Sequence, residues 1–178
     1  MAVQWAGIEA AVIAWLKSAT GVTSVIYRHQ QIPALPYCSV VFDGPRNLGS
    51  VDEVRYAYDN AQPNGSEVQQ TVVGQREFTV SVQAYSVQER DAGTAKELLG
   101  VARTWLSKPS QRALFAAVGA SFIDATAVDN LPVLGDLGQG RAHMDVRFRT
   151  VDSVIDPVGY IATVNGGPGT SGPSGTYS

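Results

Sequence analysis

The chain has 178 residues, a formal net charge of −3 and one cysteine, Cys38. This length predicts one well-buried domain, and the weakly acidic balance excludes a strong basic field for holding nucleic acid. A single cysteine excludes an internal disulfide framework and is typical of a reducing compartment. No apolar run approaches the roughly 20 residues of a membrane helix, and the amino terminus lacks a basic region, so we expect cytoplasmic synthesis and no membrane partner.

The first part of the chain predicts a helix followed by two strands. Over residues 3–20 the large apolar side chains share one helical face, and Gly21 follows as a stop: Trp5, Ile8, Val12, Trp15, Leu16 and Ala19. Tryptophans at this spacing are typical of a core. Residues 25–27 and 37–42 read as strands, joined by an extended, proline-rich connection. Cys38 falls on the apolar side of the second strand, which predicts a buried and inert thiol.

Residues 44–74 predict a hairpin that is too long for the core. Its centre, residues 59–66 (DNAQPNGS), is a turn or mobile tip, and apolar residues alternate on both flanks. A strand unbroken from Glu67 to Ser86 would span about 65 Å, whereas a compact domain of this size is about 40 Å across. The hairpin therefore folds back at Gly74 or projects beyond the core. A projecting two-stranded ribbon is marginal alone in water, so projection would imply a partner.

The centre of the chain combines a strand with a helix. Alternate residues between Phe78 and Ala84 are apolar, as expected for a half-buried strand. A helical stripe follows: Ala95, Leu98, Leu99, Ala102, Trp105 and Leu106. Ser86 and Glu89 have the spacing of a capping box and predict the helix start. Packing the stripe on the strand makes an α+β layer, in which Trp15 and Trp105 are expected to be core residues.

The last third predicts a short helix over 113–118, a strand over 122–128, a loop over 130–140 and a second alternating strand. That strand points Ala142, Met144, Val146 and Phe148 inward and His143, Asp145, Arg147 and Arg149 outward. A sheet with one polar face is largely antiparallel. We therefore predict an α+β fold: a mostly antiparallel sheet, helices on one face, and a long projecting β-hairpin or loop. Residues 1–155 form the domain; residues 156–178 complete a weak strand (Val154–Val164) and a flexible tail rich in Gly, Ser and Pro.

The sequence contains little that predicts catalysis or a cofactor. Two histidines and one cysteine cannot form a usual nitrogen and sulfur metal site. No glycine-rich elbow or oxyanion loop frames Cys38 with His29 or His143. We therefore predict no enzyme, no cofactor and no metal. Arg141, Arg147 and Arg149 form a small basic stripe, which is either a solvated strand face or a surface for an acidic partner or DNA.

Several segments together resemble the tail terminator proteins of long-tailed bacteriophages, most closely the neck terminator type. They are the first helix with its Trp15–Leu16 pair, the segment VIYRHQQIPALPYCSVVF (25–42), the polar hairpin, and REFTVSVQAYS (76–86) before an alanine-rich helix. The resemblance covers about residues 3–155. It implies a hexameric ring on the last ring of the tail tube, which stops tube growth and docks the head connector. It also implies that the hairpin reaches a neighbour or the tube, and that DNA crosses the lumen without sequence-specific binding.

The resemblance leads to a set of expectations. The protein would be a virion component of the tail or neck, assembled in the host cytoplasm. Its partners would be its own copies, the tail tube protein and the head-tail connector or stopper, with the tail sheath as a further candidate. Candidate contact residues are Val54, Arg55, Tyr56, Tyr58, Asn60, Asn64, Gly65, Val68, Val72, Arg147 and Arg149. Two alternatives stay open: another neck, tail-completion or tube-associated structural protein, and an enzyme or small-ligand binder with Cys38 or the tryptophans in a pocket.

Overall fold

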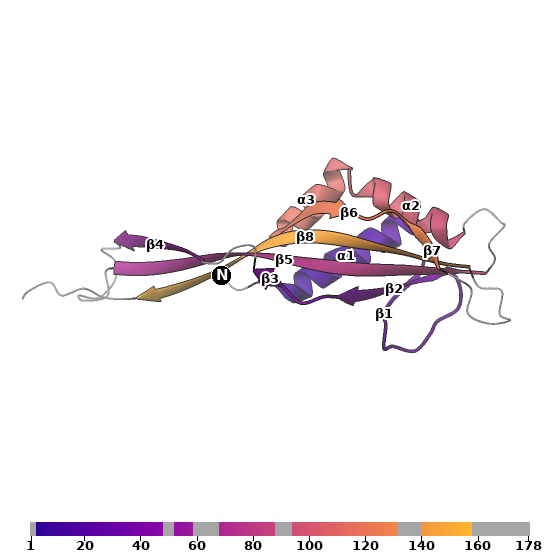
Figure 1. Cartoon of the computed structure of the whole chain (residues 1–178), viewed down its shortest axis with the longest axis horizontal. Coiled ribbons are helices and arrows are strands. Elements are labelled where there is room, and N and C mark those ends of the chain that lie inside the picture. Colours follow the sequence, from indigo (N-terminus) through magenta and orange to yellow (C-terminus); the bar gives the residue numbers. More distant parts are fainter. Residues whose placement is uncertain (1–2, 48–51, 59–67, 88–93, 132–139, 158–178) are drawn as a thin grey trace, which may run out of the picture.

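The computed structural model describes residues 3–47, 52–58, 68–87, 94–131 and 140–157, which form three helices and one eight-stranded sheet (Figure 1). The helices are α1 (Trp5–Thr20), α2 (Ala95–Trp105) and α3 (Pro109–Ala117). The strands are β1 (Ser24–Tyr27), β2 (Tyr37–Phe42), β3 (Arg46–Asn47), β4 (Glu53–Tyr58), β5 (Val68–Ser86), β6 (Ala120–Ala125), β7 (Asp129–Leu131) and β8 (Gly140–Pro157). The predicted α+β class is confirmed.

The sheet is built around the antiparallel pair of β5 and β8. Its strand order is β1-β2-β5-β8-β6, with β3 and β4 also on β5 and β7 on β8. The register of β5 with β8 is unbroken from Gln69↔Pro157 to Ser86↔Gly140. Only β1 and β2 pair in parallel among the described strands. The prediction of a mostly antiparallel sheet is therefore confirmed.

The helices cover one face of this sheet, and the core lies between the two layers. The alternation predicted for both long strands is confirmed, because the inward residues are at most 1 % exposed: Phe78, Val80, Val82, Ala84, Ala142, Met144, Val146 and Phe148. From α1, Trp15 is fully buried, packs edge-on against Phe115 and donates its Nε1–H to the carbonyl oxygen of Ala102 at 3.1 Å. That bond links α1 to α2 through the interior of the helix layer.

The two tryptophans predicted for the core differ in burial. Trp15 is confirmed as a core residue. Trp105, at the end of α2, packs against the core but is only half-buried, and Lys108 places its ammonium 3.3 Å from the ring centroid. The prediction for Trp105 was therefore wrong in degree, because the end of the helical stripe reaches the margin of the layer.

The predicted capping box of α2 was wrong. The observed box uses Thr94 and Glu97: the Thr94 hydroxyl accepts from the Glu97 amide, and the Glu97 carboxylate accepts from the Thr94 amide. Ser86 nonetheless caps α2 from the end of β5, since its Oγ accepts from the Ala95 amide at 3.1 Å. Glu89 lies outside the described residues. β5 ends at Ser86, and α2 begins nine residues later, at Ala95.

The last third of the chain agrees with the predicted order and differs in its boundaries. The short helix is α3, and Gly119 follows it at a φ of 72°, the left-handed region that favours glycine. The next strand is β6, which begins two residues before the predicted Phe122 and ends at Ala125. The predicted loop after Asp129 contains part of β7. The weak strand predicted from Val154 is the end of β8 up to Pro157, and residues 158–164 lie outside the described residues.

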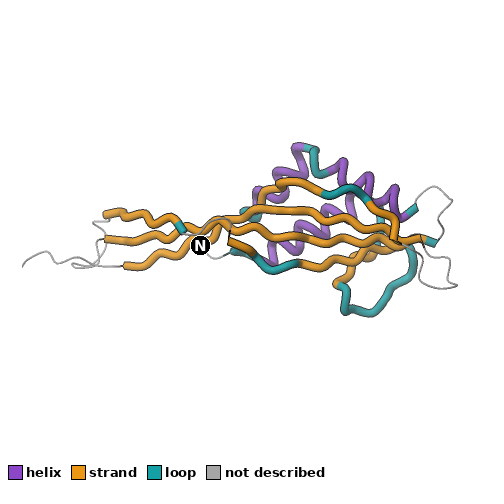
Figure 2. The backbone as a smooth tube through the Cα atoms, viewed as in Figure 1, coloured by secondary structure: helices purple, strands orange, loops and turns teal. Residues whose placement is uncertain are grey.

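Three strands extend past the helix layer as a narrow arm (Figure 2). The arm consists of β4, the first part of β5 (Val68–Val73) and the distal part of β8 (Val151–Pro157). In the arm, β5 lies between β4 and β8. The chain therefore projects instead of folding back at Gly74. The arm has a third strand that the predicted hairpin lacked, which adds a second ladder of backbone hydrogen bonds to it.

Candidate assembly interface

One face of the arm carries an apolar strip, which we define as Val54, Tyr56, Tyr58, Val68, Val72 and Val154. Strand pairing aligns Val54, Val72 and Val154 in one row and places Tyr58 opposite Val68. Val68 and Val72 are an even number of residues from the core residue Phe78 along β5, so they lie on the same side of the sheet. The strip therefore continues the core-facing side of the sheet beyond the helices.

Four of the six residues of the strip are exposed in the single chain, and Val68 and Val72 are partly buried. Tyr56, Tyr58 and Val154 are 67 %, 61 % and 59 % exposed. On the opposite face of the arm, Ile155 and Val151 are 60 % and 52 % exposed, near an ion pair between Arg55 and Glu53 at 2.8 Å. The arm holds six of the ten exposed large apolar residues among those that the structure describes. Apolar residues gathered in one exposed region are typical of an interaction site.

The base of the arm is organised by Arg76. Its guanidinium donates to both carboxylate oxygens of Asp52, at 2.7 and 2.8 Å. Hydrogen bonding from Arg76 holds the pKa of the Asp52 carboxyl below its ordinary value. Gly74 leaves room for this contact, since a Cβ added there would collide with the Arg76 guanidinium. The contact ties the segment before β4 to the point where β5 leaves the core.

Gly74→Ala is expected to displace the Arg76 guanidinium from Asp52. The pKa of Asp52 should then rise toward its ordinary value, which an NMR titration of that carboxyl measures. The depressed pKa means that the contact contributes stability above the unfolded-state pKa of Asp52, and that this contribution is lost as the pH falls through the folded-state value. Gly100→Ala is the control, because a Cβ there has no neighbour within 4 Å. An unchanged Asp52 titration in Gly74→Ala would contradict the steric argument.

The structure brings together most of the predicted contact residues. Val54, Tyr56, Tyr58, Val68 and Val72 form the strip, and Arg55 lies on the other face of the arm. Asn60, Asn64 and Gly65 lie outside the described residues. Prediction from the sequence missed Val151, Val154 and Ile155 of distal β8. The predicted weak strand was a signal for Val154 and Ile155, whereas Val151 precedes it.

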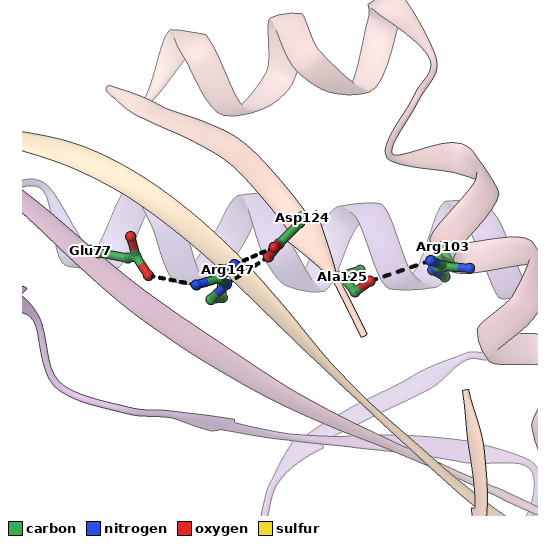
Figure 3. Close-up of polar contacts among 5 residues, drawn as sticks. All are labelled: Glu77, Arg103, Asp124, Ala125 and Arg147. Atoms are coloured by element: carbon green, nitrogen blue, oxygen red, sulfur yellow. Dashed lines mark hydrogen bonds and ion pairs between the residues drawn. The ribbon is translucent and has the colours of Figure 1, made fainter. Parts of the chain in front are cut away.

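Arg147 and Arg149 lie away from the strip, on the helix-free face of the sheet. Arg147 donates to both carboxylate oxygens of Asp124, with Nε 2.7 Å from Oδ1, and its Nη1 lies 3.5 Å from Glu77 (Figure 3). Hydrogen bonding from Arg147 lowers the pKa of the Asp124 carboxyl. Arg141 donates to Gln83 at 2.7 Å. The positive charge of Arg147 is thus compensated locally, which favours a solvated strand face over a basic surface for DNA.

The groups considered for chemistry do not form a reactive centre among the described residues. Cys38 is fully buried, and burial raises the pKa of its thiol to about 12, so the nucleophilic thiolate is not formed near neutral pH. No group of three or more possible metal ligands occurs in the described parts of the chain.

A groove of about 900 Å³ lies beside β1, where the Tyr27 hydroxyl donates to Glu9 at 2.8 Å. None of the helices described is both long and apolar enough to cross a membrane.

The fold is α+β, and its arm exposes apolar side chains that make it a candidate surface for contacts. Residues 6–172 match the family model described as phage neck terminator protein, and the chain belongs to this family. It is accordingly a structural component of the phage particle that assembles with other phage tail and head proteins. No curated protein matched the sequence.

Proposed function

We propose that this neck terminator forms a closed ring of identical subunits, six in number, at the head-proximal end of the tail. The ring ends growth of the tail tube and joins the tail to the head connector or stopper. The exposed arm is the observation that supports the proposal, since it extends past the core with a strip of apolar side chains. Contacts between two different surfaces of identical subunits close into a ring when the rotation permits.

In this proposal the arm contacts a neighbouring subunit or the tail tube protein. The body of the ring meets the head-tail connector, and the tail sheath is a further candidate partner. DNA passes through the lumen without sequence-specific contacts. The net charge of −3 and the pairing of Arg147 with Asp124 suit a surface that does not retain a polyanion.

Electron microscopy of virions labelled at the carboxyl terminus tests the proposal. We expect label arranged around the tail axis between the last tube ring and the connector. Single copies or off-axis label would contradict the ring. Binding of the purified protein to isolated tube ends, compared with binding to the portal complex, distinguishes a terminator from a structural protein at another station of the neck.

Deletion of residues 59–66 is expected to leave the subunit folded and to impair assembly. The segment has no large apolar side chain, and loop closure changes free energy only slowly with loop length, by about 0.6 kcal/mol for each doubling. The thermal unfolding midpoint should stay within a few degrees of wild type, while tubes of abnormal length or heads without tails accumulate. Normal infectious particles would show that the tip is a passive loop.

A further inference from the structure

The arm has two long strand edges that no described strand pairs with. β5 is flanked by β4 on one side and by β8 on the other. On the far side of β8, β7 and β6 pair only with residues up to Thr150. The outer edge of β4 and the outer edge of distal β8 (Val151–Pro157) therefore lie on opposite sides of the arm. An unpaired strand edge offers its amide and carbonyl groups to another strand.

In the body, two outer strands of the sheet, β1 and β6, have interrupted edges. At the end of β1, Gln30 takes up both backbone hydrogen-bonding groups of Tyr27. The Tyr27 amide donates to the Gln30 side chain, and the Gln30 amide donates to the Tyr27 carbonyl, both at 2.9 Å. β6 contains a bulge between Phe122 and Asp124. Blocked edges of these kinds prevent pairing with another chain.

The end of β6 is also covered by a side chain from α2. The Thr126 amide donates to Asp145 of β8, so the planar peptide turns the Ala125 carbonyl away from β8. Arg103 donates to that carbonyl at 3.4 Å (Figure 3). The register of β4 with β5 and that of β8 with β5 contain no such interruption along the arm. Along the arm, no described strand pairs with the outer edge of β4 or with that of distal β8.

We propose, on the basis of the proposed ring, that the outer edge of β4 in one subunit pairs with the outer edge of distal β8 in the next. β4 and β8 are both antiparallel to β5, so they run in the same direction. Subunits related by rotation about the ring axis point their arms the same way, and the new pairing is therefore parallel. The two edges have similar lengths, six residues in β4 and seven in distal β8.

This pairing joins the three-stranded arms into a continuous cylinder of sheet. It gives both outer edges of each arm a strand to pair with, which is the effect of closure in a β-barrel. It also makes the apolar strips of successive subunits adjacent around the ring. The contact uses opposite sides of the arm, so it is heterologous and propagates from subunit to subunit.

Double cysteine variants test the pairing in assembled particles. Within one chain, Arg55 and Ile155 both lie opposite Thr71, so their Cα atoms are about 9–10 Å apart, twice the strand spacing. A disulfide requires Cα atoms within about 7 Å, so a disulfide between these positions must join two subunits. Cys38 is buried with a pKa of about 12 and contributes no reactive thiol.

Arg55→Cys is combined in turn with Val151→Cys, Ser153→Cys and Ile155→Cys, which sample the register in steps of about 6.6–6.8 Å. Purified particles are oxidised and analysed on a denaturing gel without reductant. We expect one of the three combinations to give a ladder of covalent multimers up to the full ring. Arg55→Cys alone, and Arg55→Cys with Ile32→Cys, are the controls and should stay monomeric.

Each other outcome has a distinct meaning. Monomers from all three combinations, in particles that contain the protein in the neck, would overturn the edge pairing and leave the proposed ring intact. Dimers from Arg55→Cys alone would show that two β4 edges meet symmetrically, which also overturns it. Absence of the protein from the neck of the particles would overturn the proposed function itself.

Discussion

Trp15→Ala is expected to be the most destabilising single substitution described for this chain. Deletion of a fully buried tryptophan costs roughly 3–5 kcal/mol of unfolding free energy, and Trp15 has no exposed surface. The substitution also removes the donor to the Ala102 carbonyl, and a buried acceptor left unpaired costs about 1–3 kcal/mol. Denaturant unfolding should show a large fall in the midpoint concentration.

Trp105→Ala is the matched control, because it removes the same side chain from the margin of the same layer. Trp105 is half-buried, so we expect a loss of about 1–2 kcal/mol, in proportion to the smaller apolar area removed from water. Equal losses for the two variants would contradict the difference in burial. A Trp105→Ala protein that unfolds like wild type yet fails to assemble would place Trp105 on a partner surface.

Tyr56→Asp is expected to have the largest effect on assembly. The side chain is 67 % exposed in the single chain, so the thermal unfolding midpoint should change little. If the apolar strip is covered in the particle, each subunit must bury an unpaired carboxylate, which costs several kcal/mol. A cost of even 1.4 kcal/mol per contact reduces its equilibrium constant about tenfold. We therefore expect at least about a tenfold loss of tailed, infectious particles, counted by plaque titre and electron microscopy.

Ile32→Asp provides the control for Tyr56→Asp. Ile32 is 72 % exposed and lies in the connection between β1 and β2, away from the arm. The Ile32→Asp substitution introduces the same charge at a similarly exposed position. Because this position is away from the arm, particle yield should remain close to wild type. Equal losses in both variants would mean that added charge impairs assembly wherever it is placed. Normal yield from Tyr56→Asp would show that the strip stays in contact with water in the particle.

The sequence determined those features that depend on residues close together in the chain. Helical spacing identified α1 and α2, and alternation identified the core-facing sides of β5 and β8. Length also restricted the hairpin to folding back at Gly74 or projecting, because a strand of about 65 Å exceeds the diameter of the domain. The structure decided between the two, since the chain projects. Cys38 was correctly predicted to be buried from its place in an apolar strand.

Only the tertiary structure decided which distant segments meet. The residues of distal β8 alternate poorly, and pairing with β5 makes them the third strand of the arm. Ser86 caps α2 across nine residues, and β6 brings Asp124 to Arg147 across 23. Trp105 belongs to the predicted stripe, yet its exposure depends on where the layer ends. Periodicity is a property of a single element, whereas pairing, burial and charge compensation depend on the packing of elements far apart in the sequence.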